Sequence, residues 1–330
     1  IIYLSLYSCF MSLNKKILVI GCNGQIGTVL TNKLGENFGF QNVIGADIHK
    51  PQNSTKFIFE FCSVLDKENL EQIILKYKIT DVYLLAAYLS AKGEKNIDKA
   101  WDLNVNGLLH VLNFAKEKKI KKIFWPSSIA IFGPTTPKNN VDQYAIAEPT
   151  TIYGVSKLAG EGLCNYYYNS FGVDVRSIRY PGLIGWESMP GGGTTDYAVE
   201  LFYELMQNKE YTCFLSEDRT LPMMYMDDAI SATISIMDQS VEKIKLRTSY
   251  NLASISFSPK QLVEEIKKHF TDLKITYQPD ERDSLAAGWP QSINDTYARN
   301  DWGWQPKFNL SKMVTDIVLN LKNRHKIESA

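Results

Sequence analysis

Apolar runs alternate with amphipathic stretches along the first 180 residues of the chain. The runs are rich in Val, Ile, Leu and Phe, which is typical of buried strands in a parallel sheet. The predicted strands are 16–20, 42–47, 56–61, 81–87, 122–128 and 173–180. The predicted helices between them run up to residue 34, over 70–78, over 98–118 and around Tyr153. This alternation predicts an α/β fold with a doubly wound parallel sheet of the Rossmann type.

Beyond Pro181 the pattern changes, and helices dominate. They are predicted at 197–207, up to 238, near 259–270 and at 310–323, with a returning strand at 248–253. We expect 14–181 to form a dinucleotide-binding domain to which 219–254 returns. The segments 182–218 and 255–330 are expected to form a smaller, interleaved substrate lobe.

Residues 1–13 are expected to be a translated or disordered leader, with Met11 as a possible start. The apolar run at 1–10 is too short to cross a bilayer, and no later run is both long and apolar enough, so no membrane association is expected. The formal net charge is +0, which indicates no nucleic-acid partner. Five cysteines and four histidines show no metal-ligand spacing, so no metal is expected. An odd cysteine count fits a reducing compartment, the cytoplasm or a mitochondrial matrix.

Glycines at 21, 24 and 27 lie between the first strand and its helix. In a dinucleotide site the first permits a tight turn, the second lets backbone approach a pyrophosphate, and the third lets the helix pack closely on the sheet. The N-terminus of the helix then faces the phosphates. The alternative is a glycine turn in an unrelated α/β protein.

Asp47 ends the second strand, where a carboxylate can hydrogen-bond the ribose hydroxyls of a dinucleotide. It would repel a 2′-phosphate, so NAD is favoured over NADP, although Lys50 keeps NADP open. The residues expected to bind the cofactor are Gly21, Asn23, Gly24, Gln25, Ile26, Gly27, Asp47, Ile48, Ser63, Val64, Leu85, Ala86, Ala87, Asn104, Tyr153, Lys157 and Tyr180.

Tyr153 and Lys157 are four residues apart, which places them on one face of a helix. A free phenol titrates near pH ~10, and bringing it to neutrality requires roughly 4 kcal/mol. One exposed lysine cannot supply that, whereas a buried site with a second positive charge, such as an oxidised nicotinamide, can. A phenolate at Tyr153 is a candidate base for a substrate hydroxyl, and Ser128, at the end of the fifth strand, can hydrogen-bond the oxygen of that hydroxyl. The alternative is a chance pair on an ordinary helix.

The glycine- and hydroxyl-rich segment 190–196 precedes a helix and can bring backbone amides close to a small carboxylate. Candidate donors to a carboxylate are Ser90, Ser127, Gly193 and Thr194, and Asp196 is a candidate acceptor for an ammonium group. The alternative is a plain helix lead-in with a threonine N-cap. Asn104, within the apolar face of a predicted helix, either braces backbone near the site or lies on the surface.

In this order, the glycine motif, Asp47, Asn104, Ser128 and the Tyr153-x-x-x-Lys157 pair resemble the extended short-chain dehydrogenase/reductase superfamily, which includes nucleotide-sugar epimerases and dehydratases. Further segments are similar to the short-chain type of L-threonine 3-dehydrogenase. They are 90–91, 126–128, 151–157, 179–182, 190–199, 221–225 and 301–304. Two departures from that family are Ser63, where many members carry Asp near the adenine, and Ser128, where some carry Thr.

The resemblance implies a homodimer that oxidises L-threonine at its β-carbon with NAD, giving 2-amino-3-oxobutanoate. It implies Tyr153 as base, assisted by Lys157, Ser128 and Asn104. The implied substrate-binding residues are Ser90, Ser127, Ser128, Tyr153, Gly193, Thr194 and Asp196. Two other functions stay open, a nucleotide-sugar epimerase or dehydratase and a non-enzymatic NAD-binding sensor. The Ser128, Tyr153 and Lys157 set disfavours the sensor, and the single, negative charge of 191–196 disfavours a diphosphate substrate.

Overall fold

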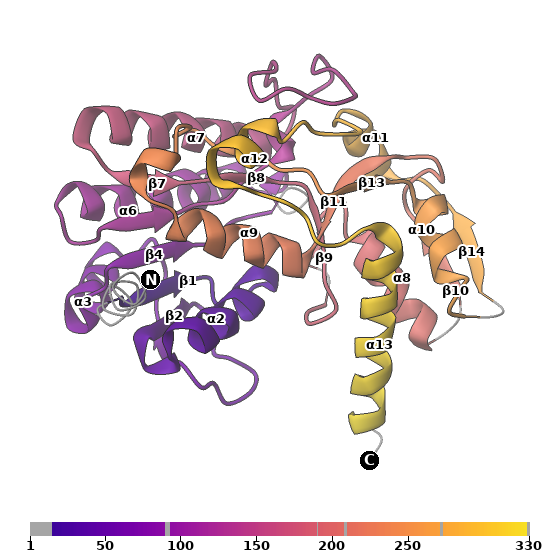
Figure 1. The fold of residues 1–330 in the computed structure, drawn as a ribbon, viewed down its shortest axis with the longest axis horizontal. Helices are drawn as coiled ribbons and strands as arrows, with labels where there is room; N and C mark the ends of the chain where they lie inside the picture. Colours follow the sequence, from indigo (N-terminus) through magenta and orange to yellow (C-terminus); the bar gives the residue numbers. More distant parts are fainter. Residues whose placement is uncertain (1–14, 90–92, 190, 208–209, 271–272, 329–330) are drawn as a thin grey trace, which may run out of the picture.

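The computed structural model describes residues 15–89, 93–189, 191–207, 210–270 and 273–328 (Figure 1). Its larger part is a six-stranded parallel sheet with the strand order β3-β2-β1-β4-β5-β7. The strands are β1 (Ile17–Ile20), β2 (Val43–Asp47), β3 (Ile58–Phe61), β4 (Asp81–Leu84), β5 (Lys122–Phe124) and β7 (Asp174–Arg176). The chain runs outward from β1 to β3 and then crosses back to β4, so the strand order reverses beside β1. This confirms the predicted doubly wound parallel sheet.

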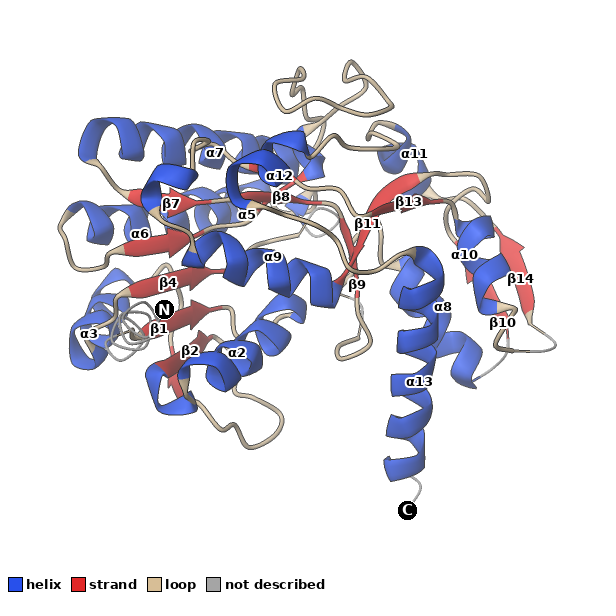
Figure 2. Cartoon of the chain, in the orientation of Figure 1, coloured by secondary structure: helices blue, strands red, loops and turns tan. Residues whose placement is uncertain are grey.

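Alternation along β1 distributes the core over both faces of the sheet. Ile17 and Val19 pack with α2 (Gln25–Phe38) and α9 (Met226–Asp238). Leu18 and Ile20 face the opposite way, where three helices cover the sheet. These are α3 (Lys67–Tyr77), α6 (Gly107–Lys116) and α7 (Ile152–Phe171). Figure 2 shows this helix–sheet–helix layering.

Two predicted strands are split in the structure. The run at 122–128 divides into β5 and β6 (Ser127–Ser128), because Pro126 between them has no N–H to donate to a ladder. The run at 173–180 divides into β7 and β8 (Ile178–Tyr180). The strands β6 and β8, together with β12 (Tyr250–Asn251), form a separate three-stranded sheet. The predicted strand at 81–87 is also shorter, since β4 ends at Leu84.

The predicted helix at 98–118 is interrupted. It consists of α5 (Ile97–Trp101), a π-helical turn (Asp102–Asn106) and α6. Asn104 lies on the π-helical turn with only 3% of its surface exposed, so it is not a surface asparagine. Wider turns of this kind re-aim a side chain within a continuous helix and are frequent at functional sites.

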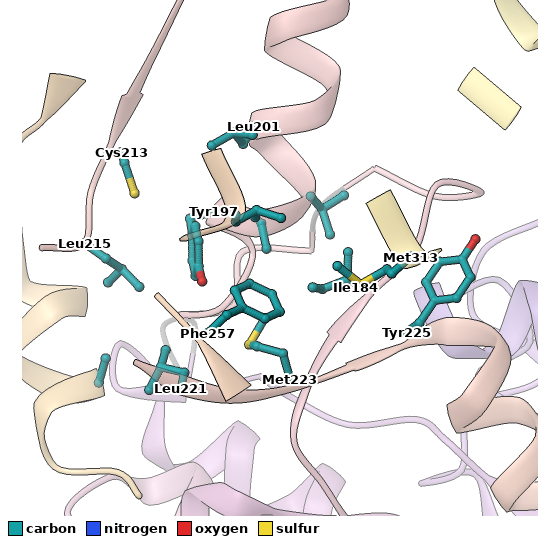
Figure 3. Packing of buried hydrophobic residues seen from close by; sticks show 14 of the residues in the cluster. Ile184, Tyr197, Leu201, Cys213, Leu215, Leu221, Met223, Tyr225, Phe257 and Met313 are labelled. Carbon is teal, nitrogen blue, oxygen red and sulfur yellow. The ribbon is translucent and has the colours of Figure 1, made fainter. Parts of the chain in front are cut away.

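The C-terminal lobe is built on its own sheet of β9 (Gly182–Ile184), β11 (Leu221–Tyr225) and β13 (Ile255–Phe257). Its remaining elements are α8 (Tyr197–Gln207), β10 (Glu210–Cys213), α10 (Pro259–Ile266), β14 (Lys274–Tyr277), α11 (Glu281–Ala287) and α13 (Leu310–Glu328). Figure 3 shows Tyr197, Met223 and Phe257 within the core of this lobe.

The structure divides the segment 219–254 between the two parts of the molecule. Its strand β11 pairs with β9 and β13 of the C-terminal lobe. Its helix α9 and strand β12 return to the first domain, where α12 (Thr296–Trp302) joins them. Single-turn 3-10 helices occur at Phe40–Asn42, Ile129–Ile131 and Val241–Lys243. The expected leader at 1–13 lies outside the described residues. Within the described ranges, no helix has the length and apolar character needed to cross a membrane.

Candidate active site

A cavity of about 620 Å³ opens at the carboxyl ends of β1, β2 and β4. It is lined by Ile20, Gly21, Asn23, Gly24, Asp47, Ile48, His49, Cys62, Ser63, Val64, Leu65, Leu85, Ala86, Ala87, Tyr88, Lys99, Asp102 and Leu103. We call it the cofactor cavity. It lies where the strand order reverses, which is where open α/β sheets bind their ligands.

The glycine turn beside this cavity requires residues without side chains. Gly21 has φ +88°, and a Cβ atom there would lie 2.7 Å from the backbone N of Ala86. A Cβ atom on Gly27 would lie 2.1 Å from the carbonyl oxygen of Gly21. The turn therefore brings α2 close to β1 and keeps backbone at the cavity wall, which fits a dinucleotide pyrophosphate.

Asp47 is oriented by the same turn. Its carboxylate accepts hydrogen bonds from the backbone N–H groups of Asn23 and His49, each at 3.0 Å. A carboxylate has about four lone-pair sites, so two remain for the hydroxyls of a ribose. Ser63 lines the cavity as a neutral residue, and its hydroxyl accepts a hydrogen bond from the backbone of Leu65.

A second cavity, of about 160 Å³, lies between the two parts of the molecule, and we call it the substrate cavity. Leu85 and Ala87 line both cavities, so the two are neighbours. The other lining residues are Gln25, Ile26, Leu89, Pro126, Ser127, Ser128, Ile129, Ala130, Tyr153, Lys157, Tyr180, Pro181, Gly182, Leu183, Gly193, Thr194, Thr195, Asp196 and Trp289. Gly27 and Asn104, both predicted to bind the cofactor, line neither cavity.

Tyr153 and Lys157 lie one turn apart on α7, on the face that meets residues 126–128. Thr151 caps the helix by accepting a hydrogen bond from the N–H of Gly154. The side chains of Tyr153 and Ser128 both line the substrate cavity, and Ser128 Oγ accepts a hydrogen bond from the N–H of Ala130 (3.2 Å). Lys157 Nζ donates to the carbonyl oxygen of Pro126 (2.6 Å) and lies 5.6 Å from the centre of the Tyr153 ring. The predicted trio of Ser128, Tyr153 and Lys157 is thus brought together.

Burial dominates the titration of Tyr153 and Lys157. It raises the pKa of Tyr153 to about 12, and the nearby Ser128 hydroxyl opposes the rise. Burial lowers the pKa of Lys157 to about 7. Lys157 alone therefore does not bring the Tyr153 phenol toward neutrality. The site needs a further positive charge to do so, in agreement with the energy argument made from the sequence.

Asn104 bonds residues beside both cavities. Its Oδ1 accepts from the N–H of Tyr88 (2.8 Å), and its Nδ2 donates to the carbonyl of Tyr88 (3.1 Å) and to Ser156 Oγ (3.0 Å). Tyr88 lines the cofactor cavity, whereas Ser156 precedes Lys157 on α7. Asn104 therefore braces backbone at the site, which is one of the two roles considered for it.

The substrate cavity contains polar groups without internal partners. Thr194 is 2% exposed, and its hydroxyl has no hydrogen-bond partner. The same holds for the amide nitrogen of the Gln25 side chain. Buried polar groups are almost always paired, so these two are suited to bind a ligand. Trp289, from the C-terminal lobe, was missed from the sequence because nothing in its local pattern connects it with the site.

Other candidate donors are already engaged. Ser127 is 2% exposed and donates its hydroxyl proton to Glu161 Oε1 (2.6 Å), which leaves it no proton to donate to a substrate carboxylate. The N–H groups of Gly192 and Gly193 donate to Asp196 Oδ2, each at 2.8 Å, so Asp196 fixes the backbone turn that precedes α8. Burial raises the pKa of Asp196. Ser90 lies outside the described residues. The phenol of Tyr180 is hydrogen-bonded to Thr233.

The NAD dependent epimerase/dehydratase family matches this chain over residues 17–253. The chain belongs to this family. A family member from Bos taurus, the mitochondrial L-threonine 3-dehydrogenase, is 42% identical over 309 residues, which cover 92% of this chain and 82% of that protein. The family assignment and the NAD-binding architecture make this chain an NAD-dependent enzyme and confirm the predicted cofactor.

Solved structures of the family superimpose closely on the fold. A GalE-like L-threonine dehydrogenase from Cupriavidus necator, in its holo form, is 49% identical with a TM-score of 0.91, covering 93% of this chain and 99% of its own. A monomeric L-threonine 3-dehydrogenase of metagenomic origin, in its apo form, is 47% identical with a TM-score of 0.90 and the same coverage. These similarities confirm the resemblance seen in the sequence motifs.

Proposed function

We propose that this enzyme oxidises the β-hydroxyl of L-threonine with NAD to give 2-amino-3-oxobutanoate. The observation that carries the proposal is the small substrate cavity, about 160 Å³, beside the Tyr153 phenol. A space of this size suits a small amino acid, since pockets for larger ligands have volumes of roughly 300–1,000 Å³. The named family members with 42–49% identity, described above, support the same substrate.

The residues at the junction of the two cavities suit alcohol oxidation. When bound through the glycine turn and Asp47, NAD supplies the hydride acceptor and a positive charge. Tyr153 accepts the proton of the substrate hydroxyl as the hydride leaves the same carbon, so the alcohol becomes a ketone. Ser128 holds the substrate oxygen near Tyr153. Lys157, when protonated, favours the phenolate form of Tyr153.

Charge at the substrate cavity argues against a nucleotide-sugar substrate. Lys157 and Asp196 are the charged residues among those that line it. Among the described lining residues Lys157 is the one cation, and it donates to the carbonyl oxygen of Pro126, so the described lining presents no cluster of positive charges to a diphosphate. Thr194, with its unpaired hydroxyl, instead suits a substrate carboxylate or ammonium. We therefore place the nucleotide-sugar epimerase second.

The test uses purified protein and follows NADH formation with L-threonine, D-threonine, L-serine and butane-2,3-diol. We expect L-threonine to give the largest kcat/KM, with the product mass of 2-amino-3-oxobutanoate. An epimerase assay with UDP-glucose runs in parallel. Epimerisation of UDP-glucose without activity on L-threonine would replace this proposal with the second candidate.

The predicted homodimer stays a prediction. One solved relative is described as monomeric, so family membership alone does not determine the assembly. Light scattering of the purified protein separates the two states, because a dimer doubles the mass of the 37.5 kDa chain.

A further inference from the structure

One face of α7 meets three successive residues of the segment that contains Ser128. Lys157 donates to the carbonyl oxygen of Pro126 (2.6 Å), Glu161 accepts from Ser127 (2.6 Å), and Tyr153 lines the substrate cavity together with Ser128. The three helical residues are spaced four apart, so they lie on one face of α7. We call these contacts the α7 ladder. Two of these contacts involve Tyr153 and Lys157, which belong to the proposed catalytic groups, whereas Glu161 does not.

Glu161 is fixed by a buried ion pair with Arg179 on β8. Arg179 donates to both carboxylate oxygens, through Nε to Oε1 (2.9 Å) and through one terminal nitrogen to Oε2 (2.8 Å). Its other terminal nitrogen donates to the carbonyl of Gln143 and to Asn251 Oδ1. Glu161 is 2% exposed and Arg179 7% exposed. The two-point contact restrains the carboxylate in direction as well as in distance.

The Ser127 contact determines where Ser128 points. Successive side chains of a strand face opposite sides, and Ser127 and Ser128 form the two-residue strand β6. With the Ser127 hydroxyl held against Glu161, Ser128 lines the substrate cavity together with Tyr153, and its hydroxyl accepts from the N–H of Ala130 (3.2 Å). Strand β6 is also paired with β8, in the register Ser127 with Arg179. One member of the ion pair, Glu161, therefore bonds the Ser127 side chain, and the other, Arg179, lies on the strand that pairs with β6.

A buried ion pair is weak as a source of stability, because the cost of desolvating both charges offsets most of their attraction. Its value at this position is geometric. Displacing a positioned group by about 1 Å can lower a rate by about 10²-fold. Glu161 also places a negative charge near Lys157. Burial lowers the pKa of Lys157, and the Glu161 carboxylate opposes that effect.

We propose that Glu161 and Arg179 are positioning residues that hold Ser127 so that Ser128 and Lys157 engage Tyr153. The prediction for rates rests on the proposed oxidation of L-threonine. The prediction for the ionisation of Tyr153 needs no substrate, so failure of one leaves the other testable.

The experiment compares Ser127→Ala and Glu161→Gln with two matched controls. Ser177→Ala removes another buried serine, whose hydroxyl bonds Ser249. Asp174→Asn alters the ion pairs of Asp174 with Arg176 and Arg247, at a strand outside both cavities. We expect kcat with L-threonine to fall about 10-fold in Ser127→Ala and about 10²-fold in Glu161→Gln, the scale of a misplaced group. Both controls should stay within about 2-fold of wild type, since they leave the α7 ladder intact.

The second measurement is the ionisation of Tyr153 in the NAD-bound protein. Carbon-13 NMR of ring-labelled tyrosine follows it, and Tyr153→Phe identifies the signal. Ser127→Ala and Glu161→Gln should both move the titration of Tyr153 to higher pH, because each weakens the groups that favour phenolate. The control variants should leave the titration unchanged.

A purely structural role predicts a different result. Thermal unfolding would then report a loss of stability in all four variants, with kcat and the Tyr153 titration unchanged, and that result would overturn the proposal. If Glu161→Gln does not fold, Ser127→Ala decides alone, because it leaves the ion pair in place. An inactive wild type whose Tyr153 titration still shifts in Ser127→Ala would reject the substrate but keep the positioning role.

Discussion

The cofactor cavity and the substrate cavity are neighbours built in different ways. The cofactor cavity is formed largely by backbone and small residues at strand ends, and its residues fall in short stretches between 20 and 103. The substrate cavity collects side chains from positions as distant as Gln25 and Trp289. The first is determined by local turns that each strand carries with it. The second exists only once the C-terminal lobe has docked.

The two cavities also differ in how their polar groups are satisfied. Asp47, in the cofactor cavity, is held by two backbone N–H groups. In the substrate cavity, Thr194 has an unpaired hydroxyl and Lys157 is a buried amine. A buried hydroxyl without a partner and a buried amine both cost stability, and a ligand that bonds them offsets that cost. Substitutions in the two cavities should therefore have separable effects.

The largest separation is expected for Tyr153→Phe. Loss of the phenol removes the proton acceptor, so kcat with L-threonine should fall by about 10³-fold, within the usual range for general acid–base groups. Tyr153 does not line the cofactor cavity, so the Kd for NAD, measured by titration calorimetry, should stay within about 2-fold. A variant with near-normal kcat would rule out Tyr153 as the base.

Thr194→Val should lower kcat/KM for L-threonine by about 10- to 10²-fold, because the lost hydroxyl is worth about 1.5–3 kcal/mol when it bonds a charged group. Stability should hold or rise, since a buried hydroxyl without a partner is replaced by a methyl group. Thr136→Val is the matched control. The Thr136 hydroxyl is buried and donates to the carbonyl of Ile146, outside both cavities.

The control should show the reverse pattern, with a stability loss of about 1–3 kcal/mol and unchanged kinetics. Urea unfolding and steady-state rates measure the two properties. Equal kinetic losses in Thr194→Val and Thr136→Val would mean that Thr194 does not contact the substrate.

Asp47→Ala addresses the cofactor cavity alone. The carboxylate favours ribose hydroxyls and repels a 2′-phosphate, so its removal should reduce the preference for NAD over NADP by about 10-fold, or about 1.4 kcal/mol. Asp280→Ala, which removes the N-cap of α11 far from this cavity, should leave the preference unchanged. The measurement is the ratio of kcat/KM for the two cofactors. A wild type that uses both equally well would contradict the role of Asp47.

The smallest effect is expected for Lys157→Met, and it concerns how the free energy of unfolding depends on pH. Burial lowers its pKa from the ordinary 10.5 to about 7 in the folded protein. Between these values the unfolded chain binds more protons, so this group makes stability rise as pH increases from about 7 toward about 10.5. Below pH 7 both states are protonated, and the full cost of the buried charge applies.

Lys157→Met removes the buried charge, so the variant should be more stable than wild type near pH 7, and this difference should shrink as pH rises toward about 10.5. Urea unfolding at several pH values measures the free energy of unfolding of both proteins. Parallel curves for the two proteins across the window would show that Lys157 is not buried as a charge. Lys122→Met provides a comparison at a lysine outside both cavities whose pKa burial also lowers.

The first domain and its cofactor site followed from short-range patterns. The apolar runs, the glycine turn and Asp47 each lie within one strand–turn–helix unit, so their geometry is local and readable from the sequence. The spacing of Tyr153 and Lys157 is likewise a property of one helix. The π-helical turn at Asp102–Asn106 and the break within 173–180 were not predicted, because they depend on packing and on the pairing of β8 with β12 and β6. The break within 122–128 was also not predicted, although Pro126 marks its position in the sequence.

The tertiary structure alone decided which polar groups are free and which are committed. From the sequence, Ser127 and Ser128 are equivalent hydroxyls, yet Ser127 donates to Glu161, whereas Ser128 lines the substrate cavity together with Tyr153. The pairing of Glu161 with Arg179 joins residues on different elements, and the packing of Trp289 against the substrate cavity joins distant segments. Contacts of this kind depend on how helices and strands pack against one another, and the hydrophobic pattern within a single helix or strand does not predict them. The sequence determined the chemistry that the chain offers, and long-range packing determined where that chemistry is directed.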